Sequence, residues 1–403
     1  MTAPLDRRLG LVGSVAVGMS AMIGAGLFVV FPPAVSAAGD GLLIALTIAA
    51  VVAACNAISS ARLARRHAVA GGTYVYGREQ LGPLWGYLAG WSFIAGKVAS
   101  CAAMAFALGS YLWPDHARLG ALAAVAVFTA VNLAGVEKSA AVSIPLVAGV
   151  VAIVVVAVVA MSSGGTAPSP DLPTSSGGVL EAAGLLFFAF AGYARLATLG
   201  EEVREPARTI PRAIAVTFVL VLGLYTAAAL ALLHVLGPAG LADSVRPFVS
   251  GVKAADADGL VPLVLVAAAL AAGGALLSLM LGVSRTTLAM ARDGHLPRGL
   301  AAVSVRTRVP HAAEIAVAVV VAALICFGDL VTSVAFSSFC VLIYYAIANA
   351  SAWTLDRAAV PRLVAVLGLI GCTALALSLP ASTILVGAIV VATGGALYAL
   401  RRR

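Results

Sequence analysis

Charged residues are scarce in this chain: they make up 10% of its 403 residues, against about 25% in an average soluble domain. Hydrophobic residues make up 62%, and the mean hydropathy is +1.06. A water-soluble protein of this length has too little interior to bury so much apolar surface. The composition therefore excludes a soluble enzyme, a disordered chain and a nucleic-acid-binding domain, and it predicts a protein embedded in the lipid bilayer.

Motifs of common catalytic and metal chemistry are also missing. The chain has no GxSxG, HExxH or Walker sequence, and its five histidines are scattered over loops and span ends. Its five cysteines lie inside apolar runs, which is typical of buried small residues and not of disulfides or metal ligands. We therefore expect no enzyme activity, no catalytic residue, no metal site, no cofactor and no nucleic-acid partner.

Long apolar runs fill most of the chain. About 20 apolar residues cross a bilayer as a helix, and breaks with Pro, Gly or charge separate twelve such runs. They lie at residues 9–31, 41–61, 83–112, 119–135, 139–161, 179–199, 212–236, 259–290, 311–327, 329–352, 362–379 and 381–400. Pro380 leaves open whether 362–400 forms two spans or one kinked helix. We expect an all-α polytopic membrane protein, with residues 1–403 as one transmembrane domain.

The positive charges alternate with the spans. Nearly all Lys and Arg residues outside the spans fall at the N-terminus or in every second turn. Arg118, Arg246 and Lys253 are the exceptions, on the other side. Loops rich in Lys and Arg stay in the cytoplasm. We therefore predict a multi-pass protein of the cell (plasma) membrane with both termini cytoplasmic.

Two spans carry glycine near their middle. Gly24 and Gly26 interrupt the first span, and Gly192 lies among aromatic residues in the sixth. Glycine weakens a helix by about 1 kcal/mol relative to alanine. One interpretation is close packing between helices. The other is a pair of unwound segments five spans apart, which is typical of two inverted five-helix repeats with discontinuous first helices.

Several segments carry a family resemblance. Residues 24–28 resemble a first-helix glycine signature, and residues 70–91 resemble the segment between the second and third helices of the same family. Residues 192–214 and 284–297 resemble its sixth helix with the following loop and the end of its eighth helix. Together, in order and at family spacing, they resemble the amino acid–polyamine–organocation (APC) superfamily of permeases, nearest to its cationic amino acid transporter-like branch.

This resemblance implies the LeuT-like fold, with inverted repeats at 9–161 and 179–352 and two additional C-terminal helices at 362–400. It also implies a secondary active transporter of amino acids or related amines that works by alternating access. In this family the substrate carboxylate meets backbone amides of the first break, and the amino group meets carbonyls around both breaks. The matching positions are Ser20, Ile23, Gly24, Ala25, Gly26, Phe188, Ala189, Phe190, Ala191, Gly192 and Tyr193. Phe190 or Tyr193 would be the aromatic lid.

A few polar residues inside or beside the spans are candidates for coupling and gating. Lys97 lies near the middle of its span, where a lysine costs roughly 2.5–3.5 kcal/mol on insertion scales. It either reaches an interface with its long stem or lines a central cavity with Ser100 and carries a proton. Arg195 and a pairing of Glu201 or Glu202 with Arg285 or Arg292 are gating candidates. A solvated charge cluster is the alternative for the glutamates.

The residues around these breaks also bear on substrate and coupling. The cationic branch usually carries carboxylates near Ala194 and near Lys97, and this sequence has none there, which disfavours a strictly cationic substrate. Ala271 and Ala272 stand where sodium-coupled relatives carry hydroxyls, and a hard cation needs oxygen ligands. We expect an amino acid as the small-molecule substrate, with protons as possible coupling ions or exchange instead. The alternative class is a channel or receptor-like membrane protein. The sequence predicts no oligomeric state.

Overall fold

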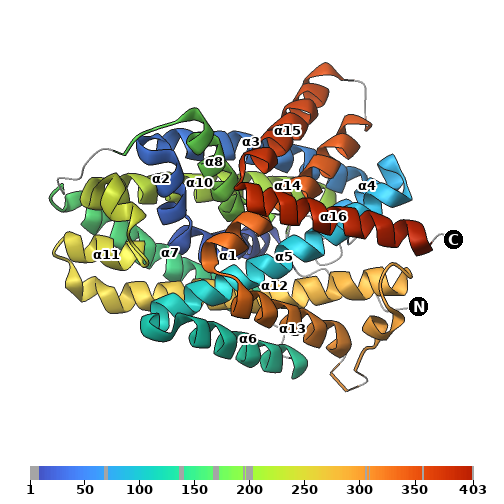
Figure 1. Cartoon of the computed structure of the whole chain (residues 1–403), viewed down its shortest axis with the longest axis horizontal. Coiled ribbons are helices and arrows are strands. Elements are labelled where there is room, and N and C mark those ends of the chain that lie inside the picture. The colour runs from blue at the N-terminus through green and yellow to red at the C-terminus, as the bar shows by residue number, and fades with distance from the viewer. Residues whose placement is uncertain are drawn as a thin grey trace.

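The computed structural model is helical throughout the part of the chain that it describes (Figure 1). That part comprises residues 9–67, 71–135, 140–166, 172–193, 196, 203–304, 306–307, 309–355 and 358–401. Within these residues the one β-type contact is an isolated bridge between Leu9 and Val203. The expected all-α class is confirmed.

The described residues of the first half of the chain form seven α-helices and two short 3-10 helices. They are α1 (Leu11–Val29), α2 (Phe31–Ala38), η1 (Gly39–Gly41), α3 (Leu42–Arg66), α4 (Thr73–Leu81), α5 (Pro83–Leu112), η2 (Pro114–His116), α6 (Ala117–Leu133) and α7 (Ala140–Ser163). The second half contains α8 (Ser176–Phe190), η3 (Ala191–Tyr193), α10 (Pro206–Ala242), α11 (Pro247–Ala254), η4 (Asp258–Leu260), α12 (Val261–Arg292), η5 (Arg298–Ala301), α13 (His311–Phe327), α14 (Leu330–Trp353), α15 (Ala359–Ser378) and α16 (Ala381–Arg401).

The long helices match the apolar runs of the sequence. In the described residues, 11 segments are long and apolar enough to cross a membrane. Helix α13 is shorter, with 17 residues, but still about 25 Å long at 1.5 Å per residue. It completes the twelve expected spans. Pro380 separates two of them, because α15 ends at Ser378, Leu379 is extended with ψ 164°, and α16 starts at Ala381.

Some elements do not follow from the apolar runs. The short helices α2, α4 and α11 lie in the segments between spans. Helix α10 is longer than the run at 212–236, but it is kinked at Gly237. This glycine has φ 65°, a left-handed conformation that a residue with a Cβ rarely adopts. The kink therefore falls directly after the predicted end of the seventh span.

The interrupted helices lie in the middle of the bundle. Helix α1 packs against α10, α12, α7 and α8, and α8 packs against α3, α2, α14 and α15. The outer helices expose large apolar side chains, for example Val127 of α6 (57%), Val319 of α13 (62%) and Leu385 of α16 (63%). Such a surface is stable against lipid and not against water.

Helix α16 fastens onto two other elements. The indole Nε1 of Trp91, on α5, donates a hydrogen bond of 2.8 Å to the carbonyl of Val390. Near its end, Arg401 donates to the carbonyl of Gly294, just after α12, also at 2.8 Å. Helix α16 therefore closes over the surface where α5 meets the end of α12.

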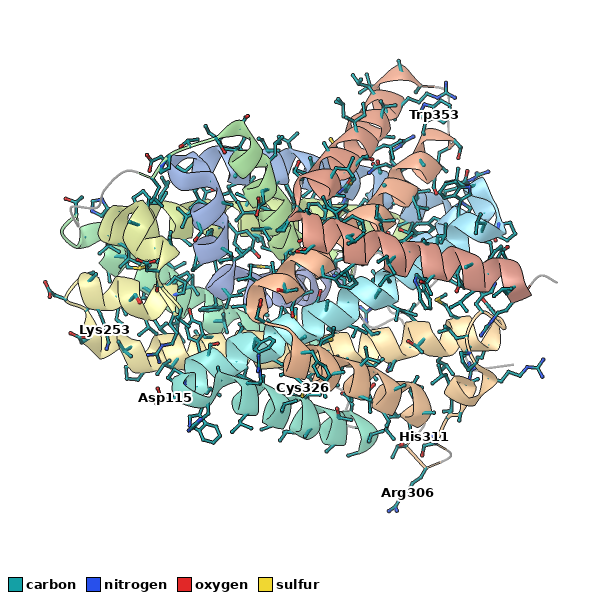
Figure 2. All side chains as sticks on the ribbon, viewed as in Figure 1. Asp115, Lys253, Arg306, His311, Cys326 and Trp353 are labelled. Atoms are coloured by element: carbon teal, nitrogen blue, oxygen red, sulfur yellow. The ribbon has the colours of Figure 1, made fainter. Side chains whose placement is uncertain are left out.

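The turns occupy two opposite ends of the bundle. Asp115 and Lys253 lie toward the left end in Figure 2, whereas Arg306 and Trp353 lie toward the right end. The alternating charges of the sequence place the first two residues on one side of the membrane and the last two on the other. The structure therefore agrees with the expected alternation of the turns.

Candidate functional site

The first interruption lies at Gly24, within α1. This residue has φ −22° and ψ −133°, outside the helical range, whereas the residues on both sides continue the helix. A Cβ at this position would lie 2.8 Å from the Cβ of Ala275, which is closer than two carbons can approach. Glycine is therefore needed here both for the backbone path and for the contact with α12.

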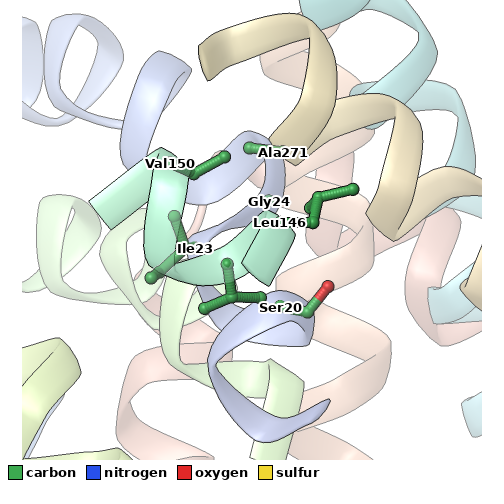
Figure 3. A pocket seen from close by; sticks show the side chains of 7 residues that line it. Ser20, Ile23, Gly24, Leu146, Val150 and Ala271 are labelled. Carbon is green, nitrogen blue, oxygen red and sulfur yellow. The ribbon is translucent and has the colours of Figure 1, made fainter. Parts of the chain in front are cut away.

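A small cavity adjoins this interruption (Figure 3). It lies between α1, α7 and α12, and its volume of about 10 Å³ is roughly the space for one water molecule. The lining residues are Ser20, Ile23, Gly24, Leu146, Val147, Val150 and Ala271. Ser20 contributes the polar side chain of this set, and no member is charged. Three predicted site residues, Ser20, Ile23 and Gly24, thus meet at one cavity.

The second interruption follows α8. The α-helix ends at Phe190 and continues as the 3-10 turn η3, Ala191–Tyr193. A Cβ at Gly192 would clash with the carbonyl of Ala21, so glycine lets this turn lie directly against α1. Tyr193 is fully buried, and its ring stacks on Tyr345 of α14 with centroids 4.9 Å apart. The turn is thus enclosed by α1 on one side and α14 on another.

Tyr225, on α10, joins the two interruptions. Its hydroxyl lies 2.6 Å from the carbonyl of Met22 and 3.0 Å from the carbonyl of Ala189. The two acceptors precede the first and the second interruption, and they share the single hydroxyl hydrogen. A Cβ at Gly26 would lie 2.8 Å from the Cα of Ala189, so the two backbones also touch directly. The predicted site residues of both breaks are therefore neighbours in space.

Lys97 lies at the second interruption. Its side chain is 5% exposed, and its ammonium group donates a hydrogen bond of 3.2 Å to the carbonyl of Ala191. The Tyr345 hydroxyl lies 3.5 Å from the same carbonyl. No ion pair found in the described residues includes Lys97. This burial argues against a lysine that reaches an interface, the alternative that the sequence left open.

Ser100, the other predicted cavity residue, lies one turn further along α5. Its hydroxyl is 2.6 Å from the hydroxyl of Ser337 on α14 and 3.2 Å from the carbonyl of Gly96. Ser100 is buried, so it links α5 to α14 beside Lys97. It does not line the cavity at Gly24.

The two aromatic lid candidates are both packed inside the bundle. Phe190 is fully buried, with its ring centroid 5.3 Å from that of Tyr225 and 5.8 Å from that of Phe218. Phe188, a neighbouring predicted site residue, is also buried, at 6% exposure. The site is therefore closed around the two breaks in this conformation.

The gating candidates are described only in part. Arg285 lies exposed on α12. Arg195, Glu201 and Glu202 lie outside the described residues, as does the side chain of Ala25. The gate ion pair considered from the sequence therefore stays a prediction.

Two polar groups of the bundle escaped the sequence reasoning. Tyr225 bridges the breaks, and Glu314 of α13 is fully buried beside Asn132 of α6. A signal for Glu314 was present in the sequence: it and Glu181 are the only acidic residues in the described spanning helices.

A polar cluster also lies at the end of α12, outside the spans. The Tyr74 hydroxyl donates to the Asp293 carboxylate and lies 2.9 Å from Nδ1 of His295. Arg78 is 3.4 Å from the same carboxylate. Burial lowers the pKa of His295, partly offset by Asp293 and reinforced by Arg78 and Arg401. Burial, followed by the hydrogen bond to Asp293, raises the pKa of Tyr74.

Comparison with known proteins agrees with this architecture. The family model described as "Amino acid permease" matches residues 13–400. A protein of Mycobacterium tuberculosis called an uncharacterized transporter is 55% identical over 99% of this chain and 92% of its own length. The branched-chain amino acid permease BcaP of Bacillus subtilis is 27% identical over 77% of this chain and 72% of its own length. The vacuolar cationic amino acid transporter 2 of Arabidopsis thaliana is 28% identical over 81% of this chain and 56% of its own length.

Interrupted helices inside a bundle of membrane-spanning helices are typical of secondary transporters. This chain belongs to the amino acid permease family, within the APC superfamily. It is therefore a multi-pass membrane transporter, and the alternative of a channel or receptor loses its support. The family implies an amino acid as the small-molecule substrate.

Proposed function

We propose that this transporter carries neutral α-amino acids across the cytoplasmic membrane by alternating access, coupled to protons or in exchange. The observation that carries the proposal is the buried ammonium group of Lys97, 3.2 Å from the carbonyl of Ala191 at the second interruption. A buried cation at this place disfavours a second cation, because like charges repel strongly in a low-dielectric interior. It therefore favours a substrate without a positive side chain.

The first interruption supplies the recognition of the substrate carboxylate in this proposal. Backbone amides at residues 23–26, at the start of a half-helix, would face the anionic group. Carbonyls of the two breaks other than that of Ala191, which accepts from Lys97, would face the amino group, and Phe190 or Tyr193 would cover the substrate. The apolar residues at the cavity beside Gly24 suit an uncharged side chain. The relatives' names cover both branched-chain and cationic amino acids, so the choice rests on the residues of this chain.

Protons fit the coupling role better than sodium. Among the lining residues of the cavity between α1, α7 and α12, only Ser20 has a side-chain oxygen. A sodium ion requires several oxygen ligands, so Ala271 and Val150 provide a poor environment for it. Lys97 can instead carry a proton through the cycle, with Ser100 holding α5 against α14 beside it.

The proposal includes a topology and two repeats. Residues 9–161 and 179–352 would form inverted repeats that rock against each other, with 362–400 as additional helices. The arginine-rich ends would face the cytoplasm, with both termini there, in the plasma membrane. Arg195, Glu201, Glu202 and Arg285 would contribute to the inner gate.

Uptake into proteoliposomes tests the substrate and the coupling together. We expect leucine, alanine and other neutral amino acids to compete for uptake at least as well as arginine or lysine. A proton gradient should drive accumulation, and a sodium gradient should not. Lys97→Gln should bind substrate and keep exchange but lose accumulation driven by the proton gradient, because the glutamine side chain does not bind and release a proton.

The exposed Lys253 of α11 provides a matched control. Lys253→Gln removes the same charge from the surface and should accumulate substrate as the wild type does. Competition by arginine and lysine alone would refute the neutral substrate. Normal proton-driven accumulation by Lys97→Gln would refute the coupling role of this residue.

Cysteine labelling tests the orientation. In a variant with its five cysteines replaced by serine, an impermeant reagent added outside cells should modify Lys253→Cys and spare Arg66→Cys. Both positions are exposed, so access to the reagent depends on the side of the membrane. The opposite labelling pattern would reverse the topology.

A further inference from the structure

Glu314 differs from the other acidic residues of the described chain in its burial. Glu314 and Lys97 are the two charged side chains that are buried in the described residues, at 0% and 5% exposure. Glu314 lies in the first turn of α13, at the arginine-rich end of the bundle, where His311 marks the start of this helix (Figure 2). A buried carboxylate is costly unless charged or hydrogen-bonding partners compensate it.

Asn132 is the hydrogen-bond partner of Glu314. Its Nδ2 donates a bond of 2.7 Å to Oε1 of Glu314 and a second bond of 3.3 Å to the carbonyl of Leu277 on α12. These two bonds use both hydrogens of the amide nitrogen. They also fix the orientation of the amide, since exchanging its oxygen and nitrogen would set an oxygen against two acceptors.

Two acceptor atoms then remain without a donor. Both are buried, and among the described residues neither Oε2 of Glu314 nor Oδ1 of Asn132 has a hydrogen-bond partner. In a planar pairing of a carboxyl with an amide, these are the two atoms that face each other once Nδ2 is bonded to Oε1. One proton on Oε2 would donate to Oδ1 and satisfy both atoms.

The hydrogen bonds and ion pairs found in the described residues include no charged partner of Glu314. Helices α5, α6 and α12 and the turn η5 pack against α13, and none of them contains an acidic residue. Their titratable or charged residues, with those of α13 itself, are Tyr87, Lys97, Cys101, Tyr111, Arg118, Arg285, Arg292, Arg298, His311 and Cys326. His311 is one turn before Glu314, and its buried Nδ1 also has no partner.

We propose that Glu314 and Asn132 form a proton-binding site, separate from Lys97, that exchanges its proton with the arginine-rich surface near His311. The proton sits on Oε2 of Glu314 and is shared with Oδ1 of Asn132. Its binding neutralises the carboxylate and completes the hydrogen bonds between α6 and α13. The position of Glu314 near the N-terminus of α13 disfavours protonation of its carboxylate, because the helix dipole favours an anion there. However, the hydrogen bonds found for Glu314 include none from a backbone amide to its carboxylate.

Infrared spectroscopy of the full-length protein in lipid vesicles tests the site without any transport assay. At neutral pH we expect the C=O stretching band of a protonated carboxylic acid, which shifts when glutamate is labelled with ¹³C at its side-chain carboxyl. The band should be lost in Glu314→Gln and kept in Glu181→Gln, the matched change at the other acidic residue of the spanning helices. It should also weaken as the pH is raised.

Asn132→Leu tests whether the protonated Glu314 is hydrogen-bonded to the Asn132 amide or is only buried. It removes the Nδ2 donor from Oε1, so the C=O band of Glu314 should move to higher frequency. The proton site would be overturned if the wild type showed no isotope-sensitive C=O band at neutral pH. It would also be overturned if this band were unchanged in Glu314→Gln. A band of Glu314 that stays constant over the pH range in which the protein is folded would overturn the exchange with the surface. Because the readout is the carboxyl group itself, these outcomes are independent of whether the proposed substrate is correct.

Discussion

The interruption of α1 at Gly24 opens onto the apolar side chains of α7 and α12, whereas the interruption after α8 holds the ammonium group of Lys97 on a backbone carbonyl. Both use glycine to bring backbones into contact, at Gly26 with Ala189 and at Gly192 with Ala21. Both also share the hydroxyl of Tyr225. An interrupted helix thus supplies free backbone groups, while the neighbouring helices decide which charge these groups meet.

The contact between the two interruptions can be broken at Gly26. Gly26→Val should reduce uptake to background, because a Cβ there would lie 2.8 Å from Cα and 2.9 Å from Cβ of Ala189, and backbone atoms cannot move aside cheaply. Insertion into the membrane should persist, since valine is apolar. Radiolabelled uptake and the amount of protein in the membrane fraction measure the two effects.

Gly149→Val is the matched control for this change. Gly149 lies on α7, and a Cβ at this position would meet nothing within 4 Å. Uptake by this variant should stay close to that of the wild type. Equal loss in both variants would mean that valine disturbs the protein wherever it replaces a glycine of the bundle.

The shared hydroxyl can be removed with Tyr225→Phe. The carbonyls of Met22 and Ala189 would lose their common donor inside the bundle, which costs about 1–3 kcal/mol. We expect the Tm of the detergent-solubilised protein to fall by about 1 °C for each kcal/mol in a chain of this length, together with a lower rate of uptake.

Tyr111→Phe sharpens this measurement. Tyr111 is equally buried, but its hydroxyl donates to one carbonyl, that of Phe28, at 3.1 Å. Its loss should lower the Tm by less than the loss of the Tyr225 hydroxyl. If Tyr111→Phe is the more harmful change, Tyr225 does not hold the two interruptions together.

The smallest expected effect concerns His295, in the polar cluster at the end of α12. Its replacement tests whether a pH effect arises at this surface cluster or at the two interruptions. Burial lowers the pKa of His295 in the folded protein, so the unfolded chain binds the proton first as the pH falls through about 6.5. The stability that neutral His295 contributes is complete above this pH and is lost as the pH falls through the folded pKa. Between pH 7.5 and 5.5, the Tm should therefore fall less in His295→Gln than in the wild type.

His116→Gln is the control, because His116 is exposed at the opposite end of the bundle. It should leave the pH dependence of the Tm unchanged. Loss of the pH dependence of uptake in His295→Gln would move the coupling away from Lys97 and toward the surface cluster of Tyr74, Asp293 and His295.

The spans could be predicted from the sequence because a helix needs about 20 apolar residues to cross the hydrocarbon core of the bilayer. The runs at 83–112 and 311–327 match α5 and α13 residue for residue, and Pro380 separates α15 from α16 since proline cannot continue a helix. The short helices α2, α4 and α11 were not predicted. They lie between the spans, where no long apolar run marks an element and local turns with tertiary contacts decide the structure.

The parts of the candidate site that contain glycine within a span could be predicted from the sequence. The interruption predicted at Gly24 is present, and Lys97 proved to be buried, which the cost of a lysine in the bilayer had suggested. The roles of these residues stay predictions. Tyr225 and Asn132 were missed because a single tyrosine or asparagine in an apolar helix has no periodicity, and its importance depends on which carbonyl or carboxyl a distant helix brings near it.

The bond between Trp91 and the carbonyl of Val390 has a consequence for the making of this protein in the cell. A ribosome inserts α5 long before it reaches α16, and the two bonded residues are 299 positions apart. During that interval the indole of Trp91 has to find another partner or stay in a hydrated position. A chain that stops at Pro380 would leave this surface uncovered and the indole Nε1 of Trp91 without its acceptor.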